Sequence, residues 1–520
     1  MPTSANASRE TTLTAFYERG IGTRNWAVFS NRDPLRIVYV GDETANLHHL
    51  VQSEAPERRL HFPFPSFKPV LPWKPDAGTA GPGSYLTAAV SQDLSSFPAR
   101  EVRDALVRTY FENIHPGNPI IDEAEFRRQY EDPADPPPLL LFHAVLLAAS
   151  RISDHPMIVS ARPTVTSTLF RRTKTLFDMR YENDRVFLVQ AALLLAWHVD
   201  DSDTISNNAY HWVGQASRIA FGLGMHRDLS DQSPSIMPAA DRRIYRKLFW
   251  AVLQAETYTA LEYGCPPSIR VEDYDQPPLE DSDFLNFNGS SDQVVERSFC
   301  TLNAEICETG LDVLSMNAPR AKWVDSASVD SRLADLAIRL PHTHDFWSCQ
   351  LRINHSLVTL VLHRCGRQND SALLSREAAS TILTTFESIM AQSNTRKCSL
   401  HCSTALLAAA MQFSQDVKTA IETGSVMRAL TAHAQLERVL RPMKALSAYW
   451  PHVEALHKLC VRLSGRCSER IKASTARPAV FGVGAAGSGY VDMPLQDIMV
   501  GYQLPDLGQM FAAEDWMNTF

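Results

Sequence analysis

Three side chains near position 400 combine a histidine with two thiols. Cys398, His401 and Cys402 offer the nitrogen and sulfur ligands that zinc prefers in proteins. A structural zinc site needs four such ligands, and no second Cys/His pair with suitable spacing accompanies this group in the sequence. We therefore interpret these residues as buried or free thiols beside a histidine, and we expect this chain to hold no metal and no other cofactor.

An aspartate cluster is the second candidate for metal chemistry. Asp200, Asp201 and Asp203 follow the apolar segment FLVQAALLLAWHV. Carboxylates on one helical face hold the Mg²⁺ ions that grip a diphosphate, and the cluster resembles this part of isoprenoid synthases. Such a site needs a second cluster on a facing helix, and in the nearest match Phe187 stands in place of the hydroxyl residue. A solvated loop is the favoured interpretation, with a Mg²⁺-dependent isoprenoid-type synthase as the alternative.

A glycine pattern, GVGAAG at 482–487, has the spacing of a dinucleotide-binding loop. That function requires a strand before the loop, a helix after it and an acidic residue about 20 positions further on. None of these surrounds the pattern, whose composition is typical of a flexible linker. The sequence also lacks nucleophile-elbow, zinc-protease and phosphate-loop motifs. We therefore expect a protein that is not an enzyme.

These residues belong to a chain of ordinary globular composition. Its 520 residues are 45% hydrophobic and 21% charged, and the formal net charge of −8 excludes a basic nucleic-acid coat. The first of nine cysteines is Cys265, which excludes a disulfide-rich scaffold and any Cys-ligated zinc module in the preceding sequence. The longest apolar runs are shorter than the roughly 18 residues of a membrane span, so no membrane contact is expected.

The distribution of proline and glycine, together with the spacing of apolar residues, divides the chain into three expected regions. Residues 1–94 are rich in proline and glycine, which predicts an extended arm. Within it RIVYVGD (36–42) has the content of a strand but stands alone, and the proline-dense run in 54–84 cannot sustain a helix or a central strand. Residues 95–475 begin with signals for a helix start near Ser95. They show apolar residues at helical spacing, as in Val102, Leu106, Tyr110 and Ile114, and almost no strand alternation. The fold class predicted is all-α, an irregular multi-helix bundle, with a largely disordered tail over 476–520. Further helices are predicted at 138–151, 163–180, 184–199, 207–225, 240–263, 293–315, 328–340, 346–366, 373–391, 402–423, 426–448 and 450–464.

The tail alternates acids with apolar side chains and contains no Lys or Arg after Arg477. Mutual repulsion of the acids keeps the apolar side chains exposed, a composition typical of an amphipathic activation segment. A terminal helix docked on the bundle is the alternative interpretation. If the segment contacts coactivator grooves, the residues expected to do so are Met493, Phe511, Asp515, Trp516 and Phe520.

Two neighbouring segments carry clear helix-stop signals. In 209–228 we expect Gly214 to permit close approach of another helix and Gly224 to end the helix, with His226 and Arg227 near the C-terminal dipole. In 242–279 the corresponding stop is Gly264, and the prolines that follow prevent continuation. The physical interpretation is a pair of core helices.

This pair closely resembles the fungal-specific transcription factor domain, the middle homology region of fungal zinc-cluster regulators. Segment 36–52 also resembles the arm that precedes this domain in cutinase-type activators, and 110–126 resembles the family's entry segment. The family's usual Asp-Arg is Glu256–Thr257 here, and Cys265 replaces the arginine of its Gly-Arg-Pro. The matching residues taken as structural family positions are Gly214, Arg218, Gly224, His226, Arg227, Arg246, Trp250, Gly264 and Pro266.

The resemblance implies a nuclear transcription regulator that controls a metabolic or secondary-metabolite gene set. The family's N-terminal Zn₂Cys₆ module has no counterpart in this sequence, because the six cysteines that hold its zinc ions are absent. DNA contact is therefore expected indirectly, through a homo- or heterodimer with another zinc-cluster factor, or through a module missing from the sequence. Transcription coactivators are the other expected partners. A metabolite-sensing role for the helical region is a further alternative.

Overall fold

A computed structural model describes residues 92–182, 184–199, 207–230, 237–316, 318, 325–364 and 371–476, together with the backbone of 35–39 and 61–65. From residue 100 onward these residues are predominantly helical, which confirms the all-α prediction. Within the described part of the chain, no helix is long and apolar enough to cross a membrane.

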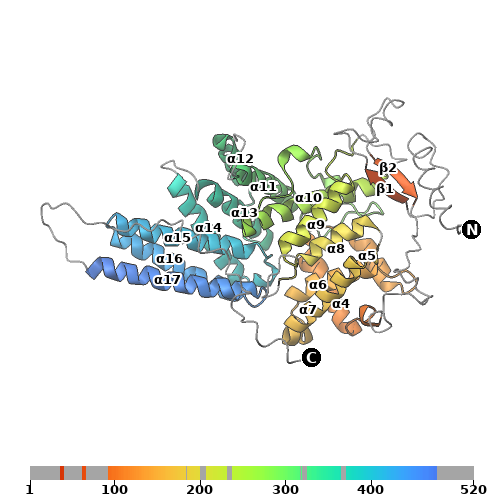
Figure 1. Cartoon of the computed structure of the whole chain (residues 1–520), viewed down its shortest axis with the longest axis horizontal. Coiled ribbons are helices and arrows are strands. Elements are labelled where there is room, and N and C mark those ends of the chain that lie inside the picture. Colours follow the sequence, from red (N-terminus) through yellow and green to blue (C-terminus); the bar gives the residue numbers. More distant parts are fainter. Residues whose placement is uncertain are drawn as a thin grey trace, which may run out of the picture.

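One end of the molecule is a block of helices that we call the N-terminal block, residues 100–263 (Figure 1). A single large hydrophobic core holds it together. Helix α6 lies deep in this core, because its sequence LLLFHAVLLAASRI is apolar around nearly the whole circumference. The helices of the block are α4 (Arg100–Asn113), α5 (Glu123–Glu131), α6 (Leu139–Ile152), α7 (Pro156–Asp178), α8 (Arg185–Leu195), α9 (Ala209–Gly222) and α10 (Ala239–Tyr263), with the 3-10 turn η4 (His115–Gly117).

The opposite end is a group of long helices that we call the C-terminal block, residues 346–476 (Figure 1). It has its own core, in which α15 packs against α16 and α17 through small residues such as Ala405 and Ala409. The helices of this block are α13 (Phe346–Arg364), α14 (Ser371–Ala391), α15 (Cys402–Glu422), α16 (Val426–Leu446) and α17 (His452–Ala476), with the turn η7 (Thr395–Lys397).

Two helices connect the blocks. Helices α11 (Arg297–Met316) and α12 (Ser326–Arg339) form a third core with α13 and with the loop that contains the turns η5 (Val271–Asp273) and η6 (Asp281–Phe284). Gly310 of α11 permits a close approach, because a Cβ there would lie 2.9 Å from the Thr257 side chain of α10. The connection between the blocks is therefore tightly packed.

The segment RIVYVGD was expected to stand alone as a strand, and the structure corrects this. Strand β1 (Leu35–Tyr39) pairs antiparallel with β2 (His61–Pro65). The proline-rich run was expected to exclude a central strand, and β2 is one half of a two-stranded ribbon. Pro63 and Pro65 occupy alternate positions of the ladder, where both missing N–H groups can point away from β1.

Several helix ends differ from the sequence prediction. The stripe of Val102, Leu106, Tyr110 and Ile114 is buried as expected, but α4 begins at Arg100 rather than near residue 95. Helix α5 was not predicted, because one buried residue gives it no apolar period. Helix α7 runs through Pro163, with a kink two residues earlier in the chain, and α17 extends beyond the predicted 464.

Candidate functional site

A cavity of about 160 Å³ lies where the two blocks and the connecting helices meet. Its walls come from the ends of α4 and α8, from α9, α10 and α11, from the start of α13 and from the segment that precedes α15. Segments more than 300 residues apart in sequence therefore share one site. A cavity of similar size engineered into another protein binds benzene, so this one has room for a small ring.

Aromatic side chains form much of the cavity wall. Trp197 follows α8, Trp347 lies in the first turn of α13, and Trp450 precedes α17. The rings of Trp197 and Trp450 pack with centroids 5.8 Å apart, and the Trp450 indole N–H donates to the Cys398 carbonyl at 3.0 Å. Because these rings are fixed by their neighbours, they present flat surfaces on which a planar ligand could stack.

A chain of amide side chains crosses the floor of the cavity between α10, α11 and α13. The Asn303 amide donates to Gln254 Oε1 at 2.6 Å, and its carbonyl oxygen accepts from Tyr258 at 2.5 Å and from Asn354 at 2.7 Å. Gln350 then donates to Asn354 Oδ1 at 2.9 Å. Such a network is worth more than its separate bonds in a buried setting, and it fixes the three helices in one arrangement.

His401 lies face to face with Tyr258 beside this network, with ring centroids 3.9 Å apart and planes 9° from parallel. Burial lowers the pKa of His401 to about 3, so the imidazole is neutral at physiological pH. Burial likewise holds the pKa of Tyr258 well above its usual value. The pair is a neutral stacked wall of the cavity.

The two thiols expected beside His401 are buried in the C-terminal core. Cys402 donates to Gln350 Oε1 at 3.2 Å, which connects it to the amide network. The contact with Cys402 and burial together raise the pKa of the Cys398 thiol. Within the described residues, the Cys/His group does not assemble into a cluster of three converging ligand atoms.

Another trio does bring its ligand atoms together: His115, Glu123 and Asp292. His115 Nε2 lies 2.9 Å from Asp292 Oδ2, and Glu123 accepts from Arg127 at 2.6 Å. Lys247 places a further positive charge near Asp292, and the pKa of this lysine is lowered by burial. Arg127 and Lys247 already place positive charges near these carboxylates, and His115 contacts Asp292 at hydrogen-bond distance. We therefore interpret the trio as polar contacts that hold η4 in place rather than as a metal site.

Most of the predicted family positions gather where α9 and α10 meet the loop 264–283. Arg227 grips Asp275 through two bonds of 3.0 and 3.2 Å, and Trp250 donates its indole N–H to the Pro277 carbonyl at 2.9 Å. Arg246 reaches Asp283 at 3.2 Å. These polar side chains hold the loop against the helix pair and leave the cavity on the other side of α10.

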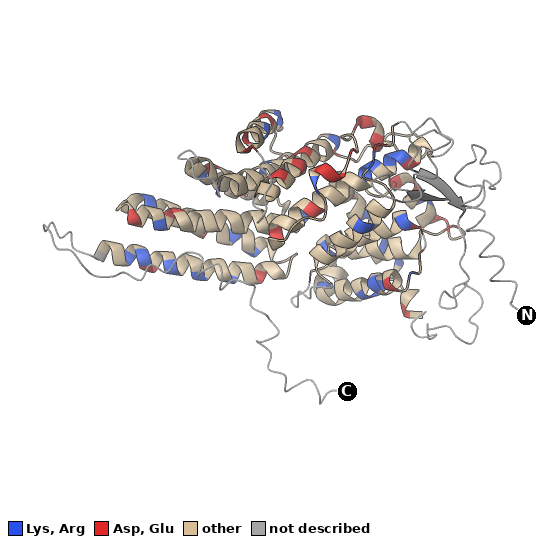
Figure 2. Cartoon of the chain, turned by 45° about the horizontal axis from the view of Figure 1, so that its top comes forward, with Lys and Arg blue, Asp and Glu red and all other residues tan. Residues whose placement is uncertain are grey.

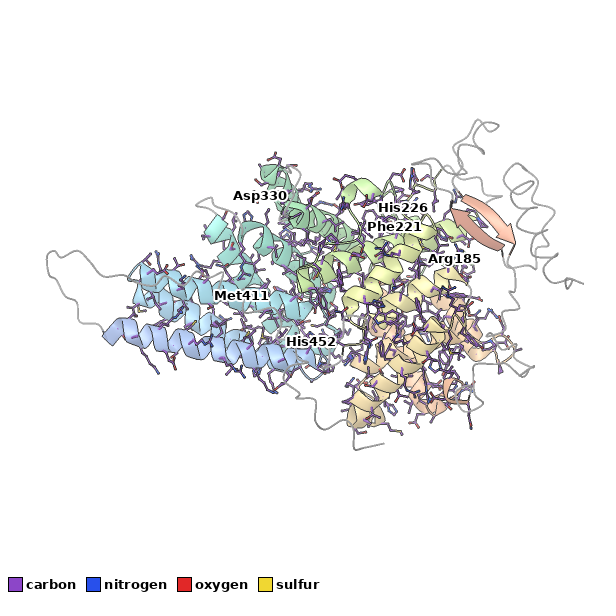
Figure 3. The ribbon with its side chains drawn as sticks, in the orientation of Figure 1. Arg185, Phe221, His226, Asp330, Met411 and His452 are labelled. Atoms are coloured by element: carbon purple, nitrogen blue, oxygen red, sulfur yellow. The ribbon has the colours of Figure 1, made fainter. Side chains whose placement is uncertain are left out.

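The turns after α9 and α10 explain four further positions. Gly224 adopts φ +67°, a left-handed conformation that glycine favours, and it ends the helix as predicted. His226 is buried, and its ring meets Phe221 edge-on at 4.7 Å (Figure 3). Gly264 ends α10 in the same left-handed way, and the Pro266 carbonyl accepts from Tyr210 at 3.0 Å.

Two of the predicted family positions, Gly214 and Arg218, neither hold the loop nor end a helix. A Cβ at Gly214 would meet nothing within 4 Å, so the expected close approach of another helix at this glycine is wrong. Arg218 is exposed on α9. The close approaches occur instead at Gly310 and at Gly117, where a Cβ would lie 2.3 Å from the Trp347 ring.

The residue pair that replaces Asp-Arg is part of the buried framework. Glu256 is 2% exposed and accepts from the Ser217 hydroxyl at 2.5 Å and from the Ser268 backbone at 3.0 Å. Thr257 donates to the Leu253 carbonyl. A single carboxylate thus joins α9, α10 and the loop after α10.

Two sets of predicted residues lie outside the described part of the chain. The aspartate cluster Asp200, Asp201 and Asp203 is one of them. The other is the tail, with Met493, Phe511, Asp515, Trp516 and Phe520. The cavity and its amides, in contrast, were not found from the sequence. The available signal was amide side chains on otherwise apolar faces, such as Asn303 in α11.

Residues 107–311 match the family of the fungal specific transcription factor domain. This range covers most of the N-terminal block and the first three quarters of α11.

Relatives with assigned functions align over most of the chain. It is 31% identical over 452 residues to an acetamidase regulatory protein of Aspergillus fumigatus, covering 82% of this chain and 55% of the relative. The acetamidase regulatory protein of Aspergillus oryzae is also 31% identical, over 86% of this chain and 58% of its own length. Cutinase transcription factor 1 alpha of Fusarium vanettenii is 27% identical, over 80% of this chain and 48% of its own length. The chain therefore spans about half the length of these relatives.

Proposed function

Because residues 107–311 match the fungal specific transcription factor domain, we propose that this chain belongs to that family and is a regulator of transcription that acts in the nucleus. The family match carries the proposal. The names of the relatives support it, since they describe an acetamidase regulator and a cutinase transcription factor. These names also favour a metabolic or biosynthetic gene set as the target. Catalysis is not part of the proposed function.

In this proposal the helical blocks form the regulatory scaffold, and the tail contacts coactivators. Phe511 and Trp516 supply the large apolar side chains, and Asp515 beside them favours an amphipathic contact with a basic-rimmed groove. The five acids of the tail stand without any lysine or arginine after Arg477, which supports this assignment.

Contact with DNA is proposed to come from outside this sequence, since no cysteine precedes Cys265. Either a dimer partner from the zinc-cluster family or an additional N-terminal zinc module would supply it. A gel-shift assay with the purified chain, at about 50 mM and about 150 mM salt, tests this part. We expect weak, salt-sensitive binding without sequence preference. Tight sequence-specific binding by this chain alone would contradict the proposal.

A reporter assay tests the activation role. The chain is fused to a DNA-binding domain of known specificity and expressed with the matching reporter. We expect activation that falls strongly when Phe511→Ala and Trp516→Ala are combined, whereas Asn518→Ala serves as the control and leaves activation unchanged. Equal activity of all three proteins would rule out the tail as the coactivator contact.

The cavity favours one additional candidate function, the sensing of a small metabolite. Its aromatic walls and its amide floor join all parts of the helical region, so a molecule bound there would bias how the two blocks pack. Gln254 is the natural polar contact, because its carbonyl oxygen is engaged by Asn303 while its amide N–H groups make no hydrogen bond to the described residues.

A thermal-shift screen of small planar compounds tests the sensing role. A ligand of the cavity raises the Tm of the chain, because it binds the folded state alone. Ala255→Phe fills space in the cavity wall and should abolish that shift, whereas Ala473→Phe on the exposed face of α17 should preserve it. A Tm rise that survives Ala255→Phe would place the ligand elsewhere.

A further inference from the structure

Helix α17 carries a row of basic residues on its exposed face. Lys458, Arg462, Arg466 and Arg470 follow one another every fourth residue, and all four are exposed. Residues four apart lie on the same side of a helix, so the four form a row roughly 18 Å long, which we call the basic row. The buried side of the helix lies opposite and contains Val453, Cys460, Cys467 and Ile471.

The charges of the basic row are largely unmatched within the fold. None of its four side chains forms an ion pair with the described residues, although Lys458 attracts the nearby Glu454. Glu469 is the sole acid in the sequence along the row. Elsewhere in the C-terminal block a comparable side chain is matched, since Arg438 pairs with Glu387. Figure 2 shows the Lys and Arg residues along this helix. The row therefore carries a net charge of about +3 that faces solvent.

Exposed apolar side chains lie on α17 and on the neighbouring helix α16. Val461 is exposed on α17 itself, and Met427 and Leu430 are exposed near the start of α16. The two helices pack side by side, and a contact of 3.0 Å between the His433 ring and the Ser464 carbonyl places the first half of α16 beside the second half of α17. The surface thus combines positive charge with uncovered apolar groups.

We propose that the basic row binds the acidic segment 491–520 of the same chain. This segment contains five acids and no base, interspersed with aromatic residues and methionines, so its chemistry complements the surface. Only 14 residues separate it from the end of α17. They span up to about 50 Å, which exceeds the helix length of roughly 38 Å. The short tether also gives the segment a high effective concentration.

Duplex DNA is the competing occupant, since phosphates also attract an arginine row. The exposed Val461, Met427 and Leu430 favour the tail, because a phosphate backbone offers them no apolar partner. Tail docking would also hide Phe511 and Trp516 from a coactivator. That consequence rests on the proposed function, whereas the docking itself does not.

Carbodiimide cross-linking of the full chain, followed by mass spectrometry, tests the contact directly. The reagent activates a carboxylate, an amine displaces it to form an amide, and the reagent leaves as its urea. We expect monomeric products in which Asp506 or Glu514 is joined to Lys458 or Lys472, roughly tenfold more often than to Lys418. Equal yields at all three lysines would overturn the proposal.

Charge reversal provides an independent test. A dye at the C-terminus of the chain reports by its anisotropy whether the tail is held. We expect high anisotropy at about 50 mM salt, and a loss of it at about 500 mM salt or with Arg462→Glu plus Arg466→Glu. The matched control, Arg108→Glu plus Arg185→Glu, changes the net charge equally at exposed positions on α4 and α8 and should behave as wild type.

A compensating variant completes the design. Adding Glu514→Lys and Asp515→Lys to the α17 double variant should restore the anisotropy, because the charges are exchanged. No restoration, or an α17 double variant that matches wild type, would overturn tail docking. A duplex of about 30 base pairs is then added to the wild-type chain. Binding of the duplex to the row without release of the tail would assign this surface to DNA instead.

Discussion

The N-terminal and C-terminal blocks use their charged residues in different ways. In the N-terminal block, charged side chains point into the fold, where each binds a loop or a neighbouring helix, as Arg227, Arg246 and Glu256 do. In the C-terminal block, Arg462 and Arg466 remain on an exposed helix face without a partner among the described residues. The region that matches the family is thus held together by buried polar contacts, whereas α17 leaves positive charges exposed to solvent.

The largest expected effects test whether each block depends on its own core. Trp212 anchors the N-terminal block and Trp450 the C-terminal block, and each is 1% exposed. Trp212→Ala and Trp450→Ala should each lower the free energy of unfolding by about 4 kcal/mol, because both remove a large buried ring. Denaturant unfolding measures this. Met157→Ala, at an exposed position, is the control, and a loss below about 1 kcal/mol at either tryptophan would contradict the assigned cores.

The next largest effect is expected when the buried carboxylate of Glu256, which joins α9 and α10, is removed. Glu256→Ala removes the carboxylate that accepts from the Ser217 hydroxyl and from the Ser268 N–H, and it leaves the hydroxyl only the Val213 carbonyl as an acceptor. The loss of these two charge-assisted bonds should cost about 3 kcal/mol of unfolding free energy. Glu112→Ala, at an exposed position on α4, should change it by less than about 0.5 kcal/mol. If the two variants were equally stable, Glu256 would not be a framework residue.

The pH dependence of stability should depend on a buried histidine of the N-terminal block. Burial lowers the pKa of His143 to about 4, although its bond to the Leu94 carbonyl opposes this. The unfolded chain therefore takes up this proton first, near pH 6.5, and stability is lost as the pH falls from there toward 4. Between about pH 6.5 and about pH 5, the titration of His143 should lower the free energy of unfolding by about 2 kcal/mol.

Denaturant unfolding at these two pH values checks the histidine prediction. His143→Gln keeps a side-chain N–H donor but does not titrate, so its stability should fall less steeply with acid than that of wild type. His457→Gln, on α17, is the comparison variant with the same change of residue. Identical pH profiles for His143→Gln and wild type would contradict the assignment.

The smallest expected effect contrasts two ion pairs. The Arg227–Asp275 pair joins a buried guanidinium to a half-exposed carboxylate, whereas Arg438 and Glu387 meet on the surface. Double-mutant cycles should give a coupling of about 1 kcal/mol for the first pair and below about 0.5 kcal/mol for the second. The reverse order would show that the N-terminal block does not depend on its polar fastenings.

Local sequence signals predicted the helices well, but they did not predict contacts between residues that are far apart in the sequence. The apolar period from Val102 to Ile114 and the stop at Gly224 act within one helix, so both were recognised. Asn303 and Asn354 meet across α11 and α13, and nothing in the spacing of either residue indicates the other. Gly214 failed for a related reason, since a small residue permits a close approach but does not create one.

The most direct test of the account is a reporter experiment with the tethered full chain and its α17 variant. If the chain is an activator whose tail is held by the basic row, Arg462→Glu plus Arg466→Glu should raise reporter output above wild type. Phe511→Ala plus Trp516→Ala should abolish that gain. Reporter output at background for the wild type and the α17 variant alike, with both proteins present in the nucleus, would contradict the central claim that this chain regulates transcription.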